Sequence, residues 1–249
     1  KELATKGKGT ACATPKEVAE RSDIVFYCVG NGDMAKDVTL GPKGLIQGAR
    51  KGTIIADCST ISPQTSREIG AAFAEKGVRF LDAPCTGSKP GADKATLTFM
   101  IGGDKAAFEE AKPYFELMGK VFYHCGGPGQ GLQAKLTQNL LLANIMQAFA
   151  EGMVLAAKGG IAPELMLEIL DNSAAKSGLV SFKAPYVLAR DFHALFAAKW
   201  MHKDITLALE SGNEMDVPLP LTSLTAQMLK AVVARGWGDD DFCSLFRTM

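Results

Sequence analysis

The sequence is poor in the residues that build metal sites and disulfide frameworks. It has only three histidines in 249 residues, and none stands at a metal-ligand spacing from another. Six cysteines are present, but no two of them form a Cys-x-x-Cys pair. This pattern predicts that no metal is bound and that the thiols are reduced, which is typical of a cytoplasmic protein.

An excess of charge of one sign is also missing. The 27 lysines and arginines balance the 27 aspartates and glutamates, and the charges are scattered along the chain. We therefore expect neither a nucleic-acid partner nor a membrane partner. No signal peptide is recognised, and no apolar stretch is expected to be long enough to span a bilayer. The length suits one large domain or two small ones, with a sizeable core.

The first half of the sequence alternates strand and helix signals. Nearly continuous apolar runs, which are typical of strands buried on both faces, occupy 23–29, 52–57, 78–82, 97–101 and 121–124. Ser62-Pro63 and Asp104 predict the starts of two intervening helices, which run to about Lys76 and Met118, each just before a glycine. Strands separated by helices predict parallel strands in an α/β sheet.

After Gly131 the strand signals stop. A long helix is predicted over 132–158, because this stretch has no proline and ends at Gly159-Gly160. Further helices are predicted at about 163–172, 178–189, 196–212, 218–235 and 240–247. The glycine cluster at 126–131 marks the boundary. We therefore predict an α/β domain over 1–128 and an all-helical domain over 129–249, joined by the long helix.

Two groups of polar residues suggest chemistry. Lys135 and Asn139 are four residues apart in the predicted long helix, so they share one face about a turn above its start. Thr86-Gly87-Ser88 follows a strand, at the sheet edge where open α/β folds bind ligands, and its glycine and hydroxyl groups suit an anion. Together they suggest carbonyl or carboxylate chemistry. The alternatives are a solvated lysine, a satisfied core amide and an ordinary glycine turn.

Four motifs then occur in a recognisable order. They are Asp57-Cys-Ser-Thr-Ile-Ser-Pro63, Asp82-Ala-Pro-Cys-Thr-Gly-Ser88, Gly129-Gln-Gly-Leu-Gln-Ala-Lys-Leu-Thr-Gln-Asn139 and Lys203-Asp204. The set resembles the β-hydroxyacid dehydrogenases, which include 3-hydroxyisobutyrate dehydrogenase, tartronate semialdehyde reductase and glyoxylate/succinic semialdehyde reductases. The resemblance implies a Rossmann-type domain followed by a 6-phosphogluconate dehydrogenase-like helical domain, and a homodimer or homotetramer.

The resemblance also implies which residues bind substrate. Lys135 matches the catalytic lysine, which protonates the carbonyl oxygen in reduction and takes the hydroxyl proton in oxidation. Thr86, Gly87 and Ser88 match the loop that holds the substrate carboxylate, which in the family usually reads Ser-Gly-Gly. Asn139 matches the asparagine that helps to hold substrate and lysine. Lys203, in a later helix, matches a lysine that faces the active-site cleft, with a solvated charge pair as the alternative.

The cofactor implied by the resemblance is NADP or NAD. The residues that match its binding segments are Val29, Gly30, Asn31, Ser59, Thr60, Lys203 and Asp204. For the segment at 29–31, the alternative is a strand-to-helix turn in which Asn31 caps the next helix. Family members open with a glycine-rich strand–loop–helix and a second strand, and neither is recognised here; residues 1–9 resemble the tail of a helix already under way. The predicted Rossmann-type sheet is therefore truncated. The choice between the cofactors stays open, with NADPH slightly favoured.

The sequence thus predicts an NAD(P)-dependent oxidoreductase that interconverts a small β-hydroxyacid and its semialdehyde or keto form. Ser88-Lys89-Pro90 resembles the lysine-bearing loop of the glyoxylate/succinic semialdehyde branch more than that of the 3-hydroxyisobutyrate branch. Three alternatives remain. An imine reductase-like enzyme generally lacks the lysine found here at Lys135, and a 6-phosphogluconate dehydrogenase has a much longer helical domain. A non-catalytic scaffold that keeps the fold is the third.

Overall fold

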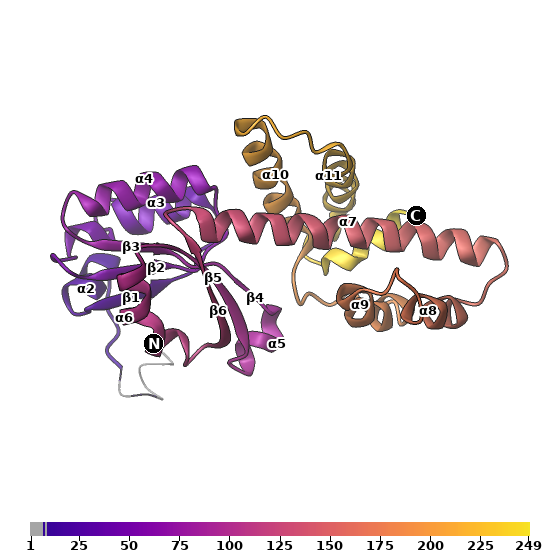
Figure 1. The fold of residues 1–249 in the computed structure, drawn as a ribbon, viewed down its shortest axis with the longest axis horizontal. Coiled ribbons are helices and arrows are strands. Elements are labelled where there is room, and N and C mark those ends of the chain that lie inside the picture. Colours follow the sequence, from indigo (N-terminus) through magenta and orange to yellow (C-terminus); the bar gives the residue numbers. More distant parts are fainter. Residues whose placement is uncertain (1–6, 8) are drawn as a thin grey trace. The chain divides into compact units, whose positions relative to one another are not determined.

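The computed structural model describes residue 7 and residues 9–249. Residues 1–6 and 8, where the helix tail was predicted, lie outside the described residues. The chain divides into two compact units. The first runs to Gly87 and includes Gly91–Lys135, and the second consists of Ser88–Pro90 and Leu136–Met249. Figure 1 traces the chain through both.

A six-stranded sheet forms the centre of the first unit. Its strands are β1 (Ile24–Tyr27), β2 (Ile54–Asp57), β3 (Arg79–Asp82), β4 (Cys85–Thr86), β5 (Leu97–Gly103) and β6 (Gly119–Gly126). β1, β2 and β3 are parallel neighbours, and β5 is parallel to β6. All but β4 lie where apolar runs predicted strands. The carboxyl ends of β1, β2 and β3 therefore meet at one edge of the sheet.

β5 departs from the parallel arrangement that the sequence predicted. It runs antiparallel to both β3 and β4. Between β3 and β5 the chain forms only β4 and the short helix α5 (Ser88–Asp93). A parallel pair usually needs a crossover helix that runs back along the sheet, and α5, with six residues, is too short to do so. The chain turns back instead, so the sheet is parallel-dominated rather than fully parallel.

Helices cover both faces of this sheet. They are α2 (Pro15–Glu20), α3 (Gly32–Leu40), the 3-10 helix η1 (Leu45–Gln47), α4 (Pro63–Ala74) and α6 (Lys105–Phe115). Neighbouring residues of β2 pack on opposite sides, as strand geometry requires. Ile55 belongs to the buried cluster with Phe73 of α4, whereas Ile54 belongs to the cluster with Phe115 of α6. α3 lies against α4 on the first of these faces (Figure 1).

In the first unit, the helices α2, α3, α4 and α6 each begin at a cap formed by a nearby side chain. Asn31 accepts a hydrogen bond from the Met34 amide at 2.9 Å, and Ser62 accepts one from Thr65 at 3.0 Å. Asp104 caps α6 in the same way. Such caps satisfy backbone N–H groups that have no partner inside the helix. The predicted helix starts at Ser62 and Asp104 are confirmed, and Asn31 takes the capping role that was the alternative to cofactor binding.

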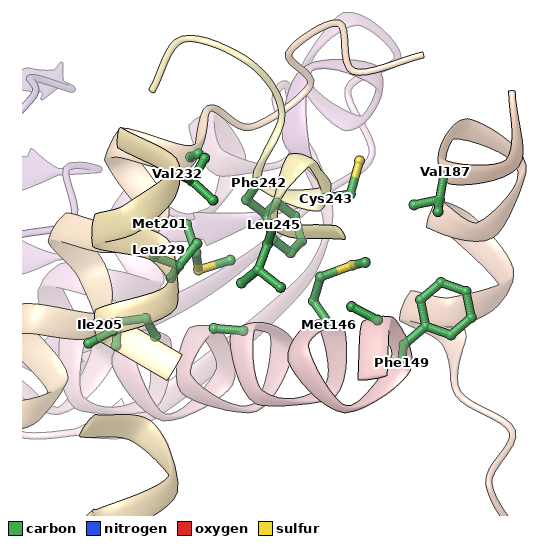
Figure 2. Close-up of a cluster of buried hydrophobic side chains, with 14 of the residues drawn as sticks. Met146, Phe149, Val187, Met201, Ile205, Leu229, Val232, Phe242, Cys243 and Leu245 are labelled. Atoms are coloured by element: carbon green, nitrogen blue, oxygen red, sulfur yellow. The ribbon is translucent and has the colours of Figure 1, made fainter. Parts of the chain in front are cut away.

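The second unit is helical, as predicted. Its elements are α7 (Gln130–Lys158), which begins in the first unit, α8 (Pro163–Asp171), α9 (Gly178–Leu188), α10 (Ala198–Glu214), α11 (Pro220–Val232), the π-helix η2 (Val233–Trp237) and the 3-10 helix η3 (Phe242–Thr248). Figure 2 shows its core, where Met146 of α7 lies among side chains from α10, α11 and η3. Met201, Leu229 and Leu245 are buried there.

α7 corrects one expectation from the sequence. It is long and apolar enough, by length and composition alone, to cross a membrane. The expectation that no apolar stretch reaches this length was therefore wrong. One face of α7 contributes Ala143, Met146, Phe149 and Ala150 to the core of the second unit. A helix that serves as the centre of a core carries the same apolar composition as a spanning helix, because both must avoid exposed charge.

A buried ion pair lies inside the second unit. The Lys183 ammonium contacts both carboxylate oxygens of Asp241, at 2.8 and 2.7 Å, and the two side chains are 3% and 2% exposed. Asp241 also accepts hydrogen bonds from the backbone N–H groups of Leu195, Phe196 and Cys243. These contacts join α9, the segment before α10 and η3, so the pair ties three parts of the unit together.

Candidate active site

Lys135 lies in the first turns of α7 and is buried, with 8% of its surface exposed. It is close to Cys85 of β4 in the first unit. Burial raises the pKa of the Cys85 thiol, and the nearby Lys135 ammonium opposes part of that rise. The alternative of a solvated surface lysine is therefore wrong. The structure brings Lys135 to the strand that leads directly into Thr86-Gly87-Ser88.

The Thr86-Gly87-Ser88 loop has an unusual backbone. Thr86 still pairs with Thr98 of β5, but Gly87 has a φ of +130° and Ser88 a φ of +54°. The positive φ favours glycine at position 87, and a Cβ there would also crowd a methyl group of Leu97 at 3.1 Å. Ser88 adopts a left-handed conformation that costs a non-glycine residue energy. The loop is thus a strained turn with two hydroxyl groups.

In the second unit, Asp204 joins two of the predicted site residues. The Asn139 amide donates a hydrogen bond to one oxygen of Asp204 at 2.6 Å, and the Lys203 ammonium lies 3.0 Å from the other. The Asp204 side chain is 2% exposed, whereas that of Lys203 is 22% exposed. Asp204, predicted as a cofactor residue, is therefore placed as a buried support for Asn139 and Lys203.

The ends of β1 and β2 are tied together by a buried network. The Ser59 hydroxyl accepts a hydrogen bond from the Val29 amide at 2.8 Å, and the Ser59 amide donates to Asp57 at 2.8 Å. Burial and the Asp57 carboxylate together hold the pKa of the Tyr27 hydroxyl well above its usual range. Gly30 and Thr60 follow these tied residues. The predicted cofactor segments thus lie side by side at the carboxyl ends of two parallel strands, which fits nucleotide binding.

Asp82 is a functional candidate that the sequence reasoning did not single out. It ends β3, is 1% exposed, and accepts hydrogen bonds from the Gly129 amide at 2.7 Å and the Leu132 amide at 2.9 Å. Burial raises the pKa of Asp82 to about 6, while these N–H groups and that of Gly131 oppose the rise. The sequence did show a carboxylate at the end of an apolar strand. It could not show the amides that bind this carboxylate, because they lie 47 and 50 residues further along the chain.

This pKa predicts how stability depends on pH. The carboxyl binds its proton more tightly in the folded protein, at about 6 rather than 3.8. Its contribution to stability is therefore fully present below about pH 3.8 and is lost as the pH rises through 6. A shift of about two pKa units corresponds to a change of roughly 3 kcal/mol in the free energy of unfolding between these two pH limits.

The measurement compares wild type with Asp82→Asn by denaturant unfolding from pH 4 to pH 7. The stability of wild type relative to the variant should fall across that range, since asparagine does not titrate. A difference that is independent of pH would show that the pKa of Asp82 is not raised.

Two models of protein families match the chain. One, described as the NAD binding domain of 6-phosphogluconate dehydrogenase, matches residues 1–127. The other, described as NAD-binding of NADP-dependent 3-hydroxyisobutyrate dehydrogenase, matches residues 129–249. The two matches follow one another along the chain, in the order of a nucleotide-binding half and a helical half.

Individual relatives agree with these matches. The 2-(hydroxymethyl)glutarate dehydrogenase of Eubacterium barkeri is 37% identical over 238 residues, which cover 95% of this chain and 79% of the relative. Glyoxylate/succinic semialdehyde reductase 1 of Arabidopsis thaliana is 32% identical over 240 residues, covering 96% and 83%. A solved structure of Mycobacterium tuberculosis 3-hydroxyisobutyrate dehydrogenase with L-serine has a TM-score of 0.88 and 30% identity, covering 95% of this chain and 82% of that one.

The Rossmann-like first unit, the helical second unit and these similarities define an NAD(P)-dependent hydroxyacid dehydrogenase. The chain belongs to the β-hydroxyacid dehydrogenase family, whose members include 3-hydroxyisobutyrate dehydrogenase. The family predicted from the four motifs is confirmed.

Proposed function

We propose that this protein interconverts a small β-hydroxyacid and its semialdehyde or keto form, with Lys135 as the general acid and base. The observation that carries the proposal is the position of Lys135. It is buried at the start of α7, beside the strand that leads into the Thr86-Gly87-Ser88 loop. A cation in such a place can hold a substrate oxygen and exchange a proton with it.

In this proposal each group has a separate task. The Thr86 and Ser88 hydroxyl groups and the backbone around Gly87 bind the substrate carboxylate, because donors in a tight turn suit an anion. In reduction the Lys135 ammonium donates a proton to the carbonyl oxygen, and in oxidation the neutral amine takes the proton of the hydroxyl group. The Asn139 amide, held by Asp204, orients the substrate. When bound, the nicotinamide supplies or accepts the hydride.

The segments at 29–31 and 59–60 would hold the nicotinamide end of the cofactor. They follow β1 and β2, and the Ser59–Val29 hydrogen bond keeps the two strand ends together. Lys203, the more exposed partner of Asp204, offers a cation to a substrate or cofactor anion.

For the substrate we propose a short semialdehyde or glyoxylate, reduced to its hydroxyacid. Two facts support this choice: the segment Ser88-Lys89-Pro90 and the likeness to a glyoxylate/succinic semialdehyde reductase. Such a substrate carries an aldehyde at one end, which suits the Lys135 ammonium. It carries a carboxylate at the other end, which suits the Thr86-Gly87-Ser88 turn.

The test measures nicotinamide oxidation with NADPH and NADH in turn. The substrates are glyoxylate, succinic semialdehyde and methylmalonate semialdehyde, and the reverse reaction is measured with 3-hydroxyisobutyrate. We expect kcat/KM to be greatest for glyoxylate or succinic semialdehyde. Much faster oxidation of 3-hydroxyisobutyrate would overturn the proposed substrate, and no turnover with any of the four would overturn the proposed reaction.

A further inference from the structure

The N-terminus of α7 is capped from a distant strand rather than from its own sequence. The first N–H groups of a helix have no partner within it, and a local Ser, Thr, Asp or Asn commonly accepts them. Here the residue before the helix is Gly129, which has no side chain to do so. The two carboxylate oxygens of Asp82 accept the Gly129 and Leu132 amides instead, across 47 and 50 residues of chain.

The start of α7 packs closely against β3 and β5, and we call this contact the junction. A Cβ on Gly131 would collide with the Met100 carbonyl oxygen and lie 2.7 Å from the Gly102 nitrogen. A Cβ on Gly102 would lie 2.5 Å from an oxygen of Asp82. The helix therefore starts with its backbone directly against β3 and β5, and Asp82 sits at the point where the three meet.

Lys135 is placed by this junction. It lies three residues after Leu132, so less than one turn of rigid helix separates its Cα from the last amide that Asp82 binds. Its neighbour Cys85 pairs with Phe99 of β5, the strand that also supplies Met100 and Gly102. The start of α7, which carries Lys135, and the strand that leads into the substrate loop both contact β5. The position of α7 against β5 therefore determines where the Lys135 ammonium lies.

We propose that Asp82 is a positioning residue: its carboxylate fixes the start of α7 against β3 and β5 and so holds the Lys135 ammonium at the substrate loop. The proposal rests on the proposed role of Lys135. A misplacement of about 1 Å at a reacting group can cost on the order of 10²-fold in rate. The negative carboxylate also suits the positive end of the helix dipole.

The test uses Asp82→Asn, which keeps one carbonyl oxygen but turns an N–H₂ group toward an N–H donor. We expect kcat to fall 10- to 100-fold, with the Kd of the cofactor within threefold of wild type and an unchanged circular dichroism spectrum. The matched control is Asp104→Ala, which removes the cap of α6 in the same unit. Its kcat should stay within twofold of wild type, since α6 carries no proposed site residue.

A second variant changes the same junction at a residue of α7. Gly131→Ala pushes the start of α7 away from Met100, so it should reproduce the loss in kcat; it also carries the test if Asp82→Asn does not fold. Combined in one protein, the two changes should cost much less than the product of their separate effects, because both release the same contact. Wild-type kcat in a folded variant at either position would overturn the proposal, as would an equal loss in Asp104→Ala.

A readout without turnover separates this inference from the proposed function. Trace labelling with acetic anhydride, quantified by mass spectrometry, compares the reactivity of Lys135 with that of exposed Lys158. We expect the ratio to rise at least fivefold in Asp82→Asn and to stay constant in Asp104→Ala. If wild type turns over no substrate, the proposed function fails and this ratio still decides the positioning role. An unchanged ratio in Asp82→Asn would overturn the positioning role even in an active enzyme.

Discussion

Replacing Lys135 with alanine is expected to lower kcat by about 10²- to 10⁴-fold, the usual contribution of general acid–base catalysis. The proposed chemistry requires a proton at the substrate oxygen as the hydride moves, and alanine cannot supply it. The Kd of the cofactor should stay within about threefold of wild type, because the segments proposed to bind it lie at the ends of β1 and β2. Steady-state kinetics and fluorescence titration of NADPH measure the two quantities.

The matched control for this change is Lys158→Ala. Lys158 is an exposed lysine at the other end of the same helix, so losing it removes the same charge from α7 without touching the site. Its activity should equal that of wild type. Addition of methylamine to Lys135→Ala should restore part of the rate, since a small amine can occupy the space the side chain leaves. A Lys135→Ala enzyme within fivefold of wild type would exclude the acid–base role.

The largest effect on stability is expected from Asp241→Ala. The change leaves the Lys183 ammonium buried without its carboxylate and removes the acceptor of three backbone N–H groups. Breaking a buried pair in this way costs about 3–5 kcal/mol. Urea unfolding followed by tryptophan fluorescence is the measurement, because both tryptophans, Trp200 and Trp237, belong to the second unit.

The control is the exposed pair formed by Lys199 and Asp239, whose side chains are 43% and 86% exposed. Asp239→Ala should cost less than about 1 kcal/mol, as surface pairs usually do. The double variant Asp241→Ala with Lys183→Met should be more stable than Asp241→Ala alone, since it no longer buries an unpaired charge. An equal loss in the free energy of unfolding from Asp241→Ala and Asp239→Ala would show that the buried pair stabilises the protein no more than the exposed pair does.

Local signals in the sequence located most of the elements. Ser62 and Asp104 each accept the amide of the residue three positions further along, so their capping roles depend only on neighbours in the chain. The apolar runs of β1 and β2 and the proline-free stretch of α7 are equally local. β4 has only two residues and α5 six, too few to show a period, and both were missed. β5 returns antiparallel because the chain between β3 and β5 forms no helix long enough for a parallel crossover.

The sequence by itself determined the family, the succession of an α/β half and a helical half, and the catalytic candidate Lys135, because ordered motifs and periodicities are properties of the chain. Only the tertiary structure decided how the candidate residues are held. Asp82 and Gly129 are 47 residues apart, Asn139 and Asp204 are 65 apart, and Lys183 and Asp241 are 58 apart. Residues so far apart in the sequence have no fixed distance in space. Only the packing of strands and helices brings the members of each pair within hydrogen-bond distance.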